Sequence, residues 1–177
     1  MTTFNCIGLD IRKKNPEQGF SADATVWEMH EELYDRAQGD LGINQNFKQL
    51  LQPENAAELS RLYKLVTSTP DAVLVSLDVS FPVFEAFMKV HWLSSSLPPE
   101  LDEYPWRFLG YDICDADGFF SYIFMTHDKD KTRKTLFDED RLTEAFSVAE
   151  AANLYIPSHA PFVVTRLRGL NLETDMP

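Results

Sequence analysis

The stretch that decides the fold is an eight-residue segment near the middle of the chain, Val73-Leu74-Val75-Ser76-Leu77-Asp78-Val79-Ser80. Valine and leucine recur at every second position, which is the period of a β-strand. On both sides of this segment the apolar residues recur every three or four positions, which is the period of an amphipathic helix. A strand flanked by helices predicts a domain of the α+β class.

Upstream of this strand the sequence predicts one further strand and three helices. Residues 4–11 alternate and predict a strand. A helix is expected over about 24–38, where Thr25 and Glu28 have the spacing of a capping box. Another helix is expected between Pro53 and Pro70. A short helix should precede it, because four apolar residues have helical spacing there: Ile43, Phe47, Leu50 and Leu51.

Downstream, Ser80 and Pro82 are typical of a helix start and predict a helix there. A proline-rich connector follows over 97–105. A β-hairpin is then predicted, because 106–113 alternate and 119–126 are rich in aromatic and β-branched residues. The dipeptide Asp117-Gly118 lies between the two runs and is typical of a tight turn.

The last two elements are a helix near 139–152, with acids at its start, and a strand over 162–167. The order of elements predicts one α+β domain over residues 1–177. We expect a mixed sheet of about five strands with helices packed on it.

Composition bounds the function. The 177 residues carry 16 Lys and Arg against 28 Asp and Glu, which gives a formal net charge of −12 at pH 7. With 44% hydrophobic residues the chain has enough apolar material for a folded core. A surface this negative disfavours binding to nucleic-acid phosphates and to anionic membranes. The first residues lack the basic region of a secretory signal, so the protein is expected to be cytoplasmic.

Motifs for metals and cofactors are incomplete. The seven glycines form no phosphate-binding loop. His30-Glu31-Glu32-Leu33-Tyr34 begins like a zinc-binding helix, but Tyr34 occupies the place of the second histidine. Asp115-Ala116-Asp117-Gly118 resembles part of a calcium loop, whose first and last ligand positions would be Ile113 and Phe124. No metal and no cofactor are therefore expected.

A catalytic alternative rests on residues far apart in the sequence. Cys114 together with His159 could form a nucleophile and base, which would make the protein a small cytosolic hydrolase. A scaffold or oligomeric interaction module is a third alternative. The two cysteines, Cys6 and Cys114, are expected to be reduced.

The acidic residues are unevenly distributed. One cluster lies along the first predicted helix: Glu28, Glu31, Glu32 and Asp35. The second lies between residues 100 and 117 with Arg107 as its only base: Glu100, Asp102, Glu103, Asp112, Asp115 and Asp117. Ordinary solubility charges would explain both clusters. A docking surface for a basic protein would also explain them, and the second cluster is the candidate site, with its last three acids together at the hairpin tip.

Two segments carry a resemblance to a known class. They are Trp106-Arg107-Phe108-Leu109-Gly110-Tyr111-Asp112-Ile113-Cys114-Asp115 and Ile156-Pro157-Ser158-His159-Ala160-Pro161-Phe162. Both resemble segments of small acidic immunity proteins of bacterial polymorphic and contact-dependent growth inhibition toxin systems, which are encoded beside secreted toxins. The resemblance implies a non-enzymatic protein that binds one cognate toxin and blocks it. The expected partner is therefore a basic toxin domain such as a nuclease, bound one to one.

Overall fold

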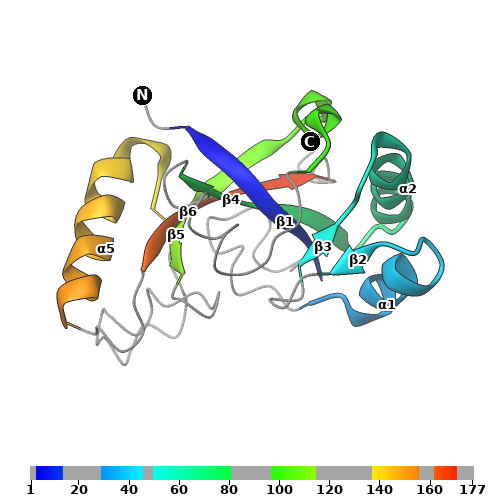
Figure 1. Ribbon diagram of the computed structural model, residues 1–177, viewed down its shortest axis with the longest axis horizontal. Coiled ribbons are helices and arrows are strands. Elements are labelled where there is room, and N and C mark those ends of the chain that lie inside the picture. The colour runs from blue at the N-terminus through cyan, green and yellow to red at the C-terminus, as the bar shows by residue number, and fades with distance from the viewer. Residues whose placement is uncertain are drawn as a thin grey trace.

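A computed structural model describes residues 3–13, 29–45, 50–80, 97–114, 137–155 and 162–170. Over these ranges the chain forms a six-stranded sheet with helices packed against it (Figure 1). The strands are β1 (Phe4–Lys13), β2 (Asn44–Gln45), β3 (Leu51–Gln52), β4 (Ala72–Ser80), β5 (Arg107–Cys114) and β6 (Val163–Leu170). The helices are α1 (Glu31–Gly39), α2 (Ala56–Thr67) and α5 (Leu142–Tyr155), with short 3-10 helices η2 (Pro99–Glu103) and η3 (Glu139–Arg141).

The strand order is β2-β3-β1-β4-β6-β5, and every described pairing is antiparallel. The α+β class predicted from the sequence is confirmed. The expectation of a mixed sheet is wrong for the strands described here, because β4 pairs in antiparallel register with both β1 and β6. All nine residues of β4 are buried, as expected for a central strand.

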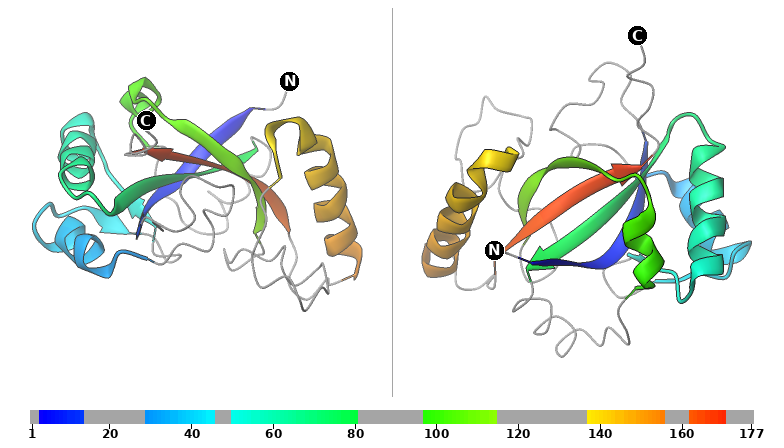
Figure 2. Two further views of the ribbon diagram at one scale, coloured as in Figure 1. Left: turned by 180° about the vertical axis from the view of Figure 1, so that it is seen from behind. Right: turned by 90° about the horizontal axis from the view of Figure 1, so that it is seen from above.

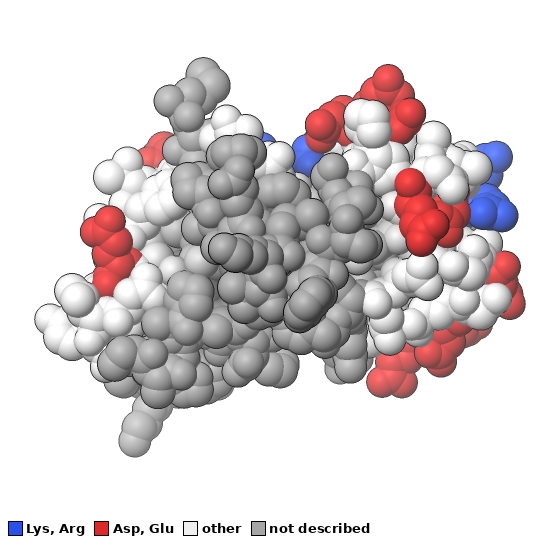
Figure 3. Space-filling model, in the orientation of Figure 1, with Lys and Arg blue, Asp and Glu red and all other residues white. Residues whose placement is uncertain are grey.

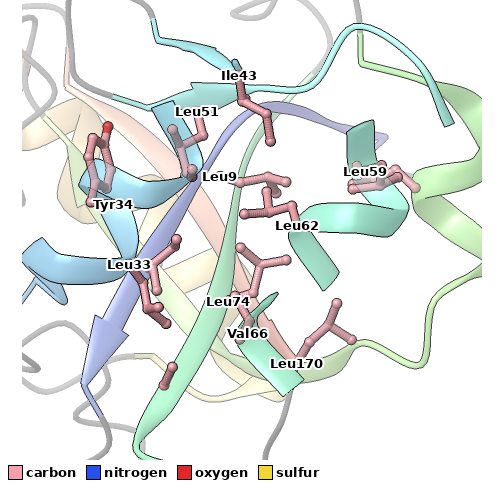
Figure 4. Packing of buried hydrophobic residues seen from close by; sticks show 14 residues of the cluster. Leu9, Leu33, Tyr34, Ile43, Leu51, Leu59, Leu62, Val66, Leu74 and Leu170 are labelled. Atoms are coloured by element: carbon pink, nitrogen blue, oxygen red, sulfur yellow. The ribbon is translucent and has the colours of Figure 1, made fainter. Parts of the chain in front are cut away.

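One face of this sheet carries two separate apolar clusters. The register places Leu74 on the same face as its partners Ile11 and Leu170, at one end of the strands. Here α1 and α2 cover the sheet and form the larger cluster, in which Leu9 and Leu62 are fully buried (Figure 4). Burial of this apolar surface supplies the main driving force for packing these helices.

The second apolar cluster lies at the opposite end of the same face. It joins Tyr111 and Ile113 of β5 to Val164 of β6, and α5 covers them with Ala145 and Ala149. Figures 1 and 2 show α5 at one end of the sheet and the α1–α2 pair at the other. The middle of this face is thus left to other residues.

The structure confirms most of the predicted elements. The strands expected over 4–11, 73–80, 106–113 and 162–167 are β1, β4, β5 and β6, and the helices expected after Pro53 and near 139–152 are α2 and α5. The start of α2 has a clear local cause. The Asn55 side chain accepts a hydrogen bond from the Glu58 N–H, and the Glu58 carboxylate accepts one from the Glu54 N–H, at 2.9 Å each.

Two helical expectations are corrected. The helix expected over about 24–38 is α1, but it begins at Glu31, because Met29 pairs with Arg12 in a β-bridge and His30 is the N-cap. The short helix expected from Ile43, Leu50 and Leu51 is instead the β2–β3 pair, in which Leu51 lies opposite Leu9 of β1.

Several expectations lie outside the described residues. They are the capping pair Thr25 and Glu28, the helix after Pro82, and the second hairpin strand over 119–126 with its Asp117-Gly118 turn.

Candidate functional site

Three acids of the candidate site lie together on η2. Glu100, Asp102 and Glu103 occupy the 3-10 turn that follows Pro98 and Pro99. The Asp102 side chain is 80% exposed, and its Oδ1 lies 3.7 Å from Nη1 of Arg168 on β6. Glu103 is also exposed, whereas Glu100 is half-buried. The three acids thus share one turn, and their role in binding a partner stays a prediction.

The η2 turn is held against the larger apolar cluster. Leu101 is buried in that cluster, and its carbonyl accepts a hydrogen bond of 2.7 Å from the Trp106 indole N–H. Tyr104 packs on Tyr63 of α2, with ring centroids 4.8 Å apart. Because the apolar side of the turn is anchored, the acids on its other side have a fixed position.

The acids of α1 form a second exposed group. The His30 imidazole accepts a hydrogen bond from the Leu33 N–H and caps the helix. Glu31 and Glu32 follow in the first turn, where negative charge is favoured by the helix dipole. Both are exposed, as is Asp35, because the opposite side of the helix buries Leu33, Tyr34 and Ala37 in the core.

Asp112 does not belong to this acidic surface. It lies within β5 opposite Thr165 of β6, it is fully buried, and its Oδ1 accepts a hydrogen bond of 2.8 Å from the Ile113 N–H. The expectation that Asp112 presents its charge at an exposed hairpin tip is therefore wrong. Asp115 and Asp117, the other two acids of that expected tip, lie outside the described residues, as does Glu28 of the first cluster.

Figure 3 shows the charges on one face of the molecule. Acidic side chains stand over η2 and over the end formed by α1 and α2, with a few basic side chains among them, and others stand over the α5 end. Over residues 29–45, 50–71 and 97–106, ten acids accompany three bases. We call the exposed acids Glu31, Glu32, Asp35, Asp102 and Glu103 the acidic end.

A second polar feature, which the sequence reasoning missed, lies in the middle of the sheet face between the two apolar clusters. Asp78 of β4 is fully buried, and its Oδ2 accepts a hydrogen bond of 2.8 Å from Arg166 Nε. Arg168 Nε lies 2.8 Å from the same oxygen, although it is not aligned for a hydrogen bond. The Ser76 hydroxyl donates to Asp78 Oδ1, and its Oγ also lies 3.2 Å from the Cys6 sulfur. We call Cys6, Ser76, Asp78, Arg166 and Arg168 the polar row.

Aromatic rings flank the two arginines of the polar row. The Arg166 guanidinium lies over the Phe4 ring and that of Arg168 over the Trp106 ring, each 5.2 Å from the ring centre. Phe4 also stacks on Tyr111, with ring centroids 5.7 Å apart. These rings cover the flat faces of the guanidinium groups and leave their edges for hydrogen bonds.

The sequence did contain a signal for the polar row. Ser76 and Asp78 are two residues apart in one apolar strand, as are Arg166 and Arg168 in another. Side chains at this spacing lie on the same face of a strand, so each strand presents a polar pair. What the sequence could not show is that β4 and β6 are neighbours, with Ser76 opposite Arg168 and Asp78 opposite Arg166.

The environment of the thiol in the polar row disfavours its reactive form. Burial raises the pKa of Cys6 well above its ordinary value, and the nearby Asp78 carboxylate raises it further. The reactive form of cysteine is the thiolate, which both effects disfavour. Of the pair in the hydrolase alternative, Cys114 ends β5 and His159 lies outside the described residues.

No group of three or more His, Cys, Asp or Glu is placed to bind a metal ion within the described residues. None of the described helices is long and apolar enough to cross a membrane. No protein-family model matches the chain, and neither does any curated protein or any solved structure.

Proposed function

We propose that this chain is a cytoplasmic immunity protein, which binds a basic toxin domain such as a nuclease and neutralises it without catalysis. The observation that carries the proposal is the acidic end, where five exposed acids stand on the anchored elements α1 and η2. A fixed cluster of negative charge raises the rate of encounter with a positive partner and disfavours nucleic acid as a competitor.

Affinity in such a complex requires apolar anchors beside the charges, because exposed ion pairs contribute little on their own. Met29 lies just before His30, the N-cap of α1, and is 40% exposed. It therefore offers an apolar contact next to Glu31 and Glu32. In this mechanism the acids govern association, and apolar contacts such as Met29 govern the lifetime of the complex.

The direct test uses the protein encoded by the neighbouring gene, since immunity genes lie beside their toxin genes. That protein, or its toxic domain, is expressed in a laboratory host with and without this chain. We expect growth arrest that this chain relieves, and a one-to-one complex by light scattering with purified proteins. Growth arrest that persists despite normal levels of this chain would refute the proposal.

The surface is tested with charge-removing variants of equal size. Glu31→Gln with Glu32→Gln removes two charges from α1, and Asp102→Asn with Glu103→Gln removes two from η2. Each should slow association with the toxin at low salt by about three- to ten-fold and flatten its dependence on ionic strength.

The matched control removes two exposed charges from the opposite end of the molecule, Glu139→Gln with Glu150→Gln. It removes the same two negative charges, so a general effect of net charge would slow association as much as the acidic-end variants do. Equal slowing by all three variants would contradict the assignment of the docking surface to the acidic end.

A further inference from the structure

A small pocket opens between the start of β1 and the η2 turn, on the sheet face that carries the polar row. It has a volume of about 100 Å³. Its polar lining includes Arg168 and Asp102, and its apolar lining includes Phe4, Leu97 and Leu101. Of this lining, the proposed function uses only Asp102, which belongs to the acidic end. We propose that it binds a short aliphatic carboxylate, with the carboxylate on Arg168 and the alkyl group against the apolar wall.

The charge balance beneath the pocket favours an anion. The single negative charge of Asp78 is shared by Arg166 and Arg168, so the polar row itself retains one surplus positive charge, which exposed Asp102 at the pocket offsets only in part from 3.7 Å. A surplus of one charge in a partly buried site matches a monoanion better than a dianion such as phosphate. The guanidinium group presents paired N–H donors with the geometry that a carboxylate needs.

Arg168 has a donor available for this ligand. Its Nη2 lies 3.4 Å from Ser76 Oγ and 3.5 Å from Asp78 Oδ1, and both distances are long for hydrogen bonds. Its Nη1 lies 3.7 Å from Asp102 Oδ1, which is beyond hydrogen-bond distance. Because the Asp102 side chain is 80% exposed, this carboxylate is a weak, hydrated partner that a ligand can displace.

The remaining lining sets the size and character of the ligand. Leu97, Leu101 and Phe4 form an apolar wall that Pro98 and Pro99 make stiff, and Asn5 and Cys6 complete the lining. The space admits only a few non-hydrogen atoms, so the alkyl part must be short. Both a free small acid and the C-terminal carboxylate of a peptide have this chemistry.

The test titrates the folded, isotope-labelled protein with propionate at constant ionic strength and follows backbone amide resonances. Propionamide serves as the neutral control of the same shape. We expect propionate to shift the amides of residues 4–6 and 97–102 and to bind at least five-fold more tightly than propionamide. Equal affinity for the two compounds, or shifts confined to other parts of the protein, would overturn the proposal.

Two substitutions test the assigned residues. Arg168→Gln should weaken propionate binding at least ten-fold, because it removes a charged donor. Asp102→Asn alters only an exposed side chain and should strengthen binding by about two- to five-fold, because it removes the competing carboxylate. If Arg168→Gln does not fold, the Asp102→Asn result decides, and an unchanged or weaker affinity would overturn the proposal.

A further titration distinguishes the two sources of the carboxylate. The tripeptide Gly-Gly-Ala with a free C-terminus is compared with propionate. Tighter binding of the tripeptide identifies a chain terminus as the ligand, and tighter binding of propionate identifies a free acid. Either result supports the carboxylate site, whereas a failure of both compounds to bind would overturn it. The toxin assays do not involve this pocket ligand, so the two proposals fail independently.

Discussion

Substitution of Asp78 by Asn is expected to be among the most damaging single changes in the sheet. The substitution keeps the shape of the side chain and removes its charge. It therefore leaves Arg166 and Arg168, whose Nε atoms both lie 2.8 Å from Asp78 Oδ2, without their shared counter-ion. Removal of one partner from a buried ion pair costs about 3–5 kcal/mol, because the remaining charge stays partly desolvated.

The magnitude here lies at the lower end of that range. The side chains of Arg166 and Arg168 are 27% and 14% exposed, so both keep some contact with water after the carboxylate is neutralised. We expect a loss of about 3 kcal/mol in the free energy of unfolding. For a chain of this length the loss corresponds to a decrease in Tm of roughly 6–12 °C.

The assay is urea unfolding at neutral pH, followed by far-UV circular dichroism, with two companion variants. Arg166→Met leaves Asp78 paired with Arg168, so it should cost less than Asp78→Asn. The triple variant Asp78→Leu, Arg166→Met and Arg168→Met removes every charge of the cluster. It should recover most of the stability, because apolar replacement of a whole buried ion pair is commonly neutral or favourable.

A loss below about 1 kcal/mol for Asp78→Asn would refute this reasoning, because it would mean that neutralising a buried shared carboxylate has the effect of a surface change. A triple variant less stable than Asp78→Asn would also contradict it. That result would show that packing and hydrogen bonds, not the unpaired charges, account for the loss.

Three further predictions concern single sites. A methyl group at Gly8 would overlap Leu50, so Gly8→Ala should cost about 1–3 kcal/mol by urea unfolding; Gly39→Ala, where nothing lies within 4 Å, is the control and should be no less stable than wild type. Asn55→Ala removes the cap of α2 and should cost about 1 kcal/mol in the same assay, and a change below 0.3 kcal/mol would contradict the capping role. Folding raises the pKa of the Cys6 thiol above its ordinary value of 9.0. The contribution of the protonated thiol to the free energy of unfolding is therefore present below pH 9, and it is lost as the pH rises from 9 through the pKa of the folded state. Accordingly, iodoacetamide at pH 8.5 should label Cys6 in urea but hardly in the native protein, as measured by peptide mass spectrometry, and rapid native labelling would contradict the assignment.

The elements that the sequence predicted well are those whose pattern is determined locally. The strand at 73–80 alternates over its whole length, and α2 combines a capping residue, Asn55, with a regular apolar stripe. The β2–β3 pair was missed because each strand has only two residues, too few to show a period. Leu51 joins the sheet because Leu9 lies opposite it, which is a tertiary contact.

The residues of the candidate site also differ in how far the sequence alone predicts their position. The exposure of Asp102 and Glu103 on η2 was predictable, because acids beside prolines in a turn commonly face solvent, whereas Glu100 in the same turn is half-buried. Asp112 was not, because a charged residue in a strand defaults to solvent and only the packing of neighbouring elements shows that it is buried. The meeting of the two polar pairs in the polar row could not be predicted from the sequence for a related reason. Asp78 and Arg166 are 88 residues apart and meet only after the sheet forms.

The strand order also governs when the protein can fold during its synthesis. β6 lies between β4 and β5, so β5 has no place in the sheet until residues 163–170 have left the ribosome. Until then the edge of β4 that will receive β6 is unpaired, and Asp78 lacks both arginines. An unpaired edge on a hydrophobic strand is a site for aggregation. The interval between translation of β4 and release of β6 is therefore the stage at which this sheet is most exposed to aggregation.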